Sequence, residues 1–95
     1  NSMERFTTLL PAGGYQTASE SIAPLAGGFS GPAIEKLAKY ENMQQRLEEE
    51  QQRITADMDA LKSQGKEKTV KFKELFGRKL ANSHVITLLQ LHGLG

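Results

Sequence analysis

A chain of 95 residues has room for one domain with a modest core, and such a chain gains much from association. With no cysteine, it has no disulfide, thiolate zinc site or cysteine nucleophile. The net charge of +1 hides an asymmetry: residues 1–61 carry five basic and nine acidic side chains, net −4, and residues 62–95 carry seven basic and two acidic, net +5. These parts could attract each other within or between chains, or both could be solvated surfaces.

The first 31 residues differ in character from the rest. Asn1 and Ser2, before Met3, are interpreted as the remnant of an expression tag. Residues 3–31 are rich in glycine, alanine and serine and keep neither a helical nor a strand periodicity, which predicts a flexible arm. Two apolar islands, Phe6–Leu10 and Ile22–Phe29, could dock on a helix or on a partner. The sequence thus divides at 31/32, with a helical hairpin or coiled-coil domain expected over 32–95.

A targeting or membrane segment is not expected. The residues after Met3 lack the apolar region of a signal peptide, and no run approaches the ~20 apolar residues that cross a membrane. We therefore expect a cytoplasmic or nuclear protein rather than a secreted one.

A long helix is predicted from Pro32 to about Lys62. Ser30 can cap its start, and Pro32 suits a first turn because it has no N–H to lose. Good helix formers dominate the segment. A heptad pattern runs along it, since Ala33, Tyr40, Leu47, Ile54 and Leu61 recur every seven residues. Such a narrow stripe must pack against another helix.

The predicted interaction seam of this helix contains two polar interruptions, Gln44 and Gln51. A buried amide costs stability but favours one register and one oligomeric state. The return segment is shorter than the long helix and covers it incompletely, so the remaining stripe favours a second chain. The seam consists of Leu37, Tyr40, Gln44, Leu47, Gln51, Ile54, Met58 and Leu61.

One or two shorter helices are predicted after a turn at Gly65. Lys68 to about Ala81 forms the first, and His84–His92 the second if Asn82-Ser83 breaks the chain and caps a new helix. If the two are continuous, the fold is a long–short helical hairpin. Val85, Leu88 and Leu89 form a candidate docking face, and Val85–Leu89 resembles short LxxLL-type helical peptides; core packing is the alternative reading.

A basic segment follows the turn and is the candidate for polyanion contacts. Phe72 and Phe76 could stack on bases, but they are better placed as core residues. The cationic candidates are Lys62, Lys66, Lys71, Lys73, Arg78 and Lys79.

No catalytic, cofactor or metal signature is recognised. His84 and His92 are predicted to lie two helical turns apart. Gly28-Phe29-Ser30-Gly31 is followed by Pro32, where a nucleophile elbow has its second glycine, and no strand is expected before it. The glycines before Pro32 lack the Gly-Lys-Ser/Thr ending of a phosphate-binding loop. Glu48, Glu49 and Glu50 point in different directions around a helix.

The sequence therefore predicts an all-α, non-enzymatic protein with a long coiled-coil helix, a turn, shorter helices and a flexible N-terminal arm. Its expected function is that of a small adaptor or complex subunit, which oligomerises, preferably as a homodimer, or binds a helical protein. The alternative is a small nucleic-acid-binding dimer. No cofactor and no small-molecule substrate is expected.

Overall fold

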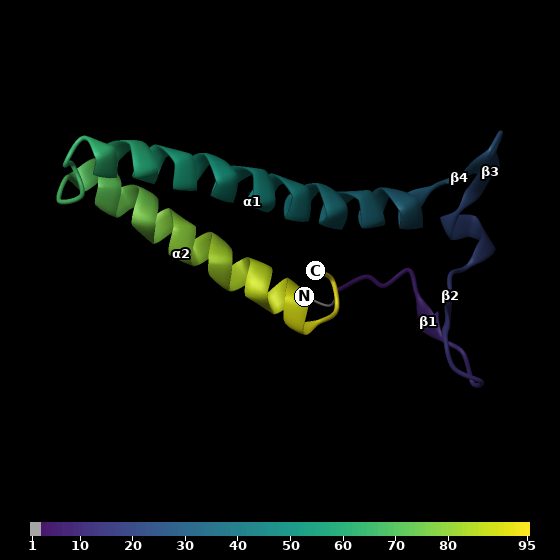
Figure 1. Cartoon of the computed structure of the whole chain (residues 1–95). Coiled ribbons are helices and arrows are strands. Elements are labelled where there is room, and N and C mark those ends of the chain that lie inside the picture. The colour runs from purple at the N-terminus through teal and green to yellow at the C-terminus, as the bar shows by residue number, and fades with distance from the viewer. Residues whose placement is uncertain (1–2) are drawn as a thin grey trace. The chain divides into compact units, whose positions relative to one another are not determined.

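A computed structural model describes residues 3–95, so the expected tag remnant at positions 1 and 2 lies outside the described residues. Packing divides the chain into two compact units, the first ending at Glu41 and the second comprising Asn42–Gly95. The helix α1, Pro32–Ser63, contributes to both units (Figure 1).

The first unit contains two small antiparallel hairpins ahead of α1. Strand β1, Thr8–Leu9, pairs with β2, Tyr15–Gln16, and strand β3, Ala23–Leu25, pairs with β4, Gly28–Ser30. A 3₁₀ turn, η1, separates the hairpins at Ser19–Ser21. Only two residues join β3 to β4, and Gly27 supplies the positive φ of 85° that so tight a connection favours.

The sequence prediction needs correction in this unit. The chain is mostly helical, but the two sheets make the all-α prediction incomplete, and hairpins occupy the segment expected to be an arm without regular structure. The strands are two or three residues long, too short to give a period-two pattern.

The joint between β4 and α1 is closed by Gly31. Its φ is 114°, and a Cβ atom there would lie 2.7 Å from the Ser21 carbonyl oxygen and 2.8 Å from Ile22 Cα. Helix α1 begins at Pro32 as predicted, but Ser30 lies in β4, and the first helical backbone bond runs from Glu35 N–H to Gly31 O at 2.9 Å. Only glycine combines this φ with so close an approach.

The second unit is a helical hairpin formed by α1 and α2, Val70–Leu91 (Figure 1). The turn after α1 is a Schellman motif: Lys66 N–H donates to Leu61 O at 2.8 Å, and Gly65 N–H donates to Lys62 O at 3.0 Å. Gly65 has a φ of 70°, so the predicted turn residue is confirmed. Thr69 caps α2 by accepting from the backbone N–H of Phe72.

Helix α2 is continuous, so the predicted break at Asn82-Ser83 does not occur. Both side chains instead bond to α1: Asn82 Nδ2 donates to Glu50 Oε1 at 3.0 Å, and Ser83 Oγ accepts from Gln51 Nε2 at 3.0 Å. Cap-forming residues stay inside the helix here because their polar groups find partners across the hairpin.

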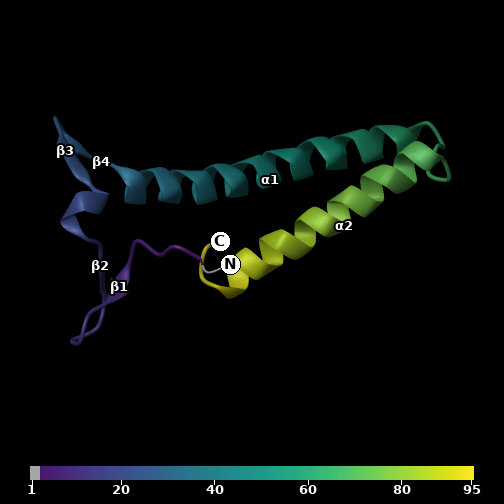
Figure 2. The same ribbon diagram turned by 180° about the vertical axis from the view of Figure 1, so that it is seen from behind.

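The core of the hairpin is small and lies toward the turn. Within residues 3–95, the buried hydrophobic side chains are Ile54, Met58 and Leu75, and the half-buried Leu61 and Phe72 pack against them. Figures 1 and 2 show the helices close beside the turn and farther apart toward the C-terminal end of α2. Of the described helices, none has an apolar stretch long enough to cross a membrane.

Candidate functional site

The predicted seam residues near the turn face α2 of the same chain. Ile54 and Met58 belong to the hairpin core, and Leu61 packs against it. In this part, the apolar stripe of α1 has its helical partner within the chain. The sequence predicted that the stripe packs against a helix, either of the same chain or of a second chain. For this half of the seam, the helix belongs to the same chain.

Gln51 is the polar centre of this interface. Its Nε2 donates to Lys79 O at 3.2 Å and to Ser83 Oγ at 3.0 Å, whereas its Oε1 is buried and meets no hydrogen-bond donor among residues 3–95. Beside it, the Glu50 carboxylate accepts from Asn82 and lies 3.9 Å from Arg78 Nε. A one-heptad shift of α2 would break all of these contacts, so they fix the register of the hairpin.

The remaining seam residues are less covered. Gln44 and Leu47 are half-buried in the second unit. Leu37 and Tyr40 lie in the first unit, where about half of each side chain is exposed. Of the eight predicted seam residues, six therefore lie in the second unit, and Leu37 and Tyr40 lie in the first.

The candidate docking residues of α2 also separate. Leu89 is half-buried, whereas Val85 and Leu88 are exposed. Leu88 belongs to a second apolar stripe, which we name the α2 outer stripe. It consists of Phe76, Leu80, Leu88 and Leu91, of which 48%, 57%, 46% and 76% are exposed.

The α2 outer stripe was not predicted from the sequence. Its residues follow one another at spacings of four, eight and three, which keeps them on one side of a continuous helix. A break at Asn82-Ser83 would have divided them between two helices. With the continuous helix, Leu80, Leu88 and Leu91 line one surface hollow together with Ser83, His84 and Thr87.

The six basic candidates differ in their contacts and exposure. Lys62 is directed at the Phe72 ring, with its Nζ 6.0 Å from the ring centroid, and Arg78 faces Glu50. Lys79 is half-buried and its carbonyl accepts from Gln51. Lys66, Lys71 and Lys73 are exposed.

Histidine and carboxylate side chains are dispersed. His92 caps the end of α2, where its Nδ1 lies 2.8 Å from Leu88 O, and His84 borders the hollow beside the outer stripe. In the part of the chain that the structure describes, no three His, Asp or Glu side chains gather closely enough to hold a metal ion.

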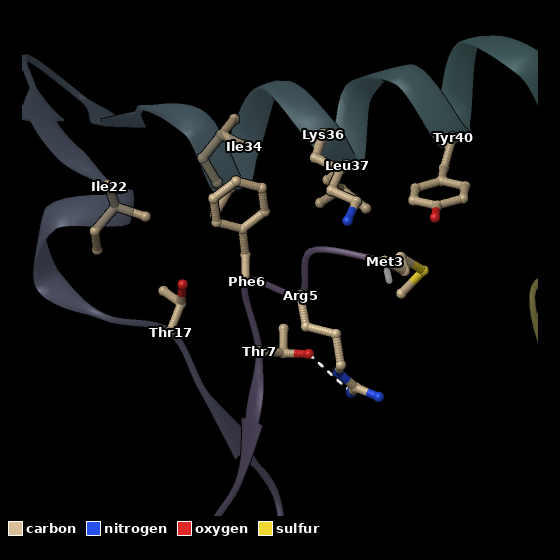
Figure 3. A pocket seen from close by; sticks show the side chains of 11 residues that line it. Met3, Arg5, Phe6, Thr7, Thr17, Ile22, Ile34, Lys36, Leu37 and Tyr40 are labelled. Carbon is tan, nitrogen blue, oxygen red and sulfur yellow. Dashed lines mark hydrogen bonds between the residues drawn. The ribbon is translucent and has the colours of Figure 1, made fainter. Parts of the chain in front are cut away.

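A second hollow lies in the first unit, between the N-terminal segment and the first turns of α1 (Figure 3). We name it the N-terminal hollow; it has a volume of about 460 Å³. Phe6 enters it from the N-terminal segment, Ile22 from the chain after η1, and Ile34 and Leu37 from α1. The full lining is Met3, Arg5, Phe6, Thr7, Thr17, Ile22, Ala33, Ile34, Lys36, Leu37 and Tyr40.

Sequence reasoning missed the N-terminal hollow, although two signals pointed to it. Phe6 and Ile22 lie in the apolar islands that were expected to be able to dock on a helix. Ala33, Ile34 and Leu37 widen the apolar stripe at the start of α1 beyond a heptad seam, which favours contact with a further segment.

Comparison with known proteins gives no relative: neither a family model nor a curated protein nor a solved structure matches the chain.

Proposed function

We propose that this chain is a non-enzymatic protein–protein interaction module, a small adaptor or complex subunit that self-associates through its helical hairpin. The α2 outer stripe is the observation that supports this proposal most. A unit with three buried hydrophobic side chains among its described residues leaves six large ones exposed on α2, and four of them form the outer stripe. Their contact with a second copy would remove this apolar surface from water.

The partner that we propose is a second hairpin of the same chain. Two hairpins packed together form a four-helix bundle, the usual way in which short helical pairs complete a core. In this arrangement the heptad stripe of α1 and the inner face of α2 form the coiled-coil layer within each chain. The outer stripes form the layer between the chains.

The opposite net charges of α1 and α2 also favour a second copy of the chain as the partner. Helix α1 carries seven acidic and five basic side chains, net −2, and α2 carries four basic and one acidic, net +3. Within the described residues, a single ion pair, Arg78–Glu50, joins opposite charges. The remaining charges are therefore available to a second copy, in which α2 of one chain would lie near α1 of the other.

The test is sedimentation equilibrium of the whole chain across a hundredfold concentration range. We expect the wild type to dimerise and the double variant Leu80→Asp/Leu88→Asp to weaken the dimer at least about a hundredfold, because each change would bury an unpaired carboxylate. Both side chains are exposed, so helical circular dichroism of the variant at low concentration is expected to match the wild type.

The matched control is Val85→Asp, which makes the same kind of change at an exposed apolar side chain of α2 that lies about a third of a turn away from the outer stripe. It is expected to leave the mass in solution unchanged. A wild type that stays monomeric throughout would contradict self-association. Leu47→Asp/Ile54→Asp, which the heptad pattern suggests as a test, is less informative because Ile54 lies in the hairpin core and its loss unfolds the hairpin as well.

The alternative, a small nucleic-acid-binding dimer, has less support. Phe72 packs against the core, and the Lys62 and Arg78 side chains face Phe72 and Glu50 within the hairpin. If nucleic acid bound nevertheless, the affinity would decrease steeply with salt.

A further inference from the structure

The N-terminal hollow has the size and the apolar lining of a small-molecule site. Its volume of about 460 Å³ lies within the range of about 300–1,000 Å³ that is common for such sites. Apolar side chains come from three separate segments, and Figure 3 shows Phe6, Ile22 and Ile34 gathered at one end and Met3 and Tyr40 at the other. An aliphatic chain would contact all three segments at once.

Two cations and no carboxylate side chain are among the described residues that line this hollow. Lys36 Nζ donates to Glu4 O and lies 5.4 Å from the centroid of the Phe6 ring. Arg5 Nη2 donates to Thr7 Oγ1 at 3.1 Å. Figure 3 shows the Arg5 guanidinium directed toward Thr7 and away from α1, whereas Lys36 lies beside the apolar lining. An ammonium has three donors, so Lys36 keeps N–H donors for a further acceptor. The charge of the lining therefore favours an anion.

We propose that the N-terminal hollow binds a small anionic amphiphile, a carboxylate with a medium-length aliphatic chain. The aliphatic chain lies along Phe6, Ile34 and Leu37, and the carboxylate accepts a hydrogen bond from Lys36. This is binding without a reaction, and it does not depend on the proposed self-association, because all of the lining residues belong to the first unit.

The test is a titration of the ¹⁵N-labelled whole chain with sodium octanoate, followed by nuclear magnetic resonance. We expect saturable shifts of the amides of Thr17, Ile22 and Leu37, and none at Leu80 and Leu88 on the α2 outer stripe. Non-saturable shifts, or equal shifts on the outer stripe, would show detergent-like adsorption to apolar surface and overturn the proposal. Octanol, which has the same chain without the charge, is expected to bind at least about tenfold more weakly.

Two lysine variants distinguish a direct contact of Lys36 with octanoate from a general effect of charge on the affinity. Lys36→Met is expected to weaken octanoate binding about tenfold, because it removes the charge-assisted hydrogen bond and keeps an apolar stem. The matched control Lys39→Met removes a cation three residues along α1, outside the hollow, and is expected to change the affinity less than twofold. Equal effects of the two variants would overturn the assignment of Lys36.

Discussion

At the scale of single residues, Gln51 shows how a polar side chain in an apolar seam acts on stability and on specificity in opposite directions. Its amide nitrogen is bonded to both Lys79 O and Ser83 Oγ, but its buried oxygen is not bonded to any described group. The contacts fix the register, and the orphaned oxygen reduces stability.

This leads to a double-mutant prediction. Ser83→Ala alone is expected to lower the free energy of unfolding by about 1 kcal/mol, because it leaves the Gln51 amide with one bond fewer. Adding Gln51→Leu is expected to restore or exceed the wild-type value, since the orphaned oxygen and its amide leave together and apolar volume replaces them. Urea unfolding followed by circular dichroism measures both changes. A double variant less stable than Ser83→Ala would contradict this interpretation.

At the scale of elements, two glycines of the hairpin, Gly65 in the turn and Gly77 in α2, have opposite effects on stability. Gly65 ends the turn with a φ of 70°, whereas Gly77 lies inside the helix, and a Cβ there would meet no described atom within 4 Å. The first glycine is required by its backbone conformation, and the second weakens the helix.

Alanine at these two positions is therefore expected to shift stability in opposite directions. Gly77→Ala raises the free energy of unfolding by about 1 kcal/mol through helix propensity. Gly65→Ala lowers it by about 1 kcal/mol, because an L-residue is strained at positive φ. Thermal melting of the two variants beside the wild type measures the difference. A stabilising Gly65→Ala would show that the turn can adopt another conformation.

The same elements show which parts of the fold can be read from the sequence. Pro32 and Gly65 mark the helix boundaries because their effects are local, and the structure places the end of α1 at Ser63, one residue beyond the predicted Lys62. The continuity of α2 through Asn82-Ser83 depends on bonds to Glu50 and Gln51, more than thirty residues earlier in the chain. Local capping preferences carry no information about such partners.

The candidate surfaces have the same limit. The apolar islands around Phe6 and Ile22 were recognised, but a hollow forms only when separate segments converge on α1. The α2 outer stripe likewise required a continuous helix. Both surfaces depend on long-range packing, which periodicity along one segment does not describe.

At the scale of the whole molecule, the separation of acidic and basic residues along the chain contributes little within the hairpin. The ion pair Arg78–Glu50 is the one formed among the described residues, its atoms are 3.9 Å apart, and most of the Arg78 side chain is exposed. Exposed pairs of this kind contribute little to stability.

Salt is therefore expected to leave the monomer almost unchanged. Raising sodium chloride from about 0.05 to 0.5 M should alter the free energy of unfolding by less than about 0.5 kcal/mol at protein concentrations at which the chain is monomeric. Urea midpoints at the two salt concentrations measure this. A decrease of several kcal/mol would show that the acidic and basic parts attract each other strongly within one chain.

Gly31 has a consequence for how this sequence can change over generations. A Cβ at this position would collide with the backbone of Ser21 and Ile22, whereas one at Gly13, Gly14 or Gly27 would meet no described atom within 4 Å, although positive φ still disfavours it there. Substitution at Gly31 therefore requires two backbone segments to separate, which no change of side chain elsewhere can offset. Among the glycines of the first unit, substitutions should therefore accumulate most slowly at Gly31. Insertions should be tolerated at Gly13-Gly14 rather than at Gly31.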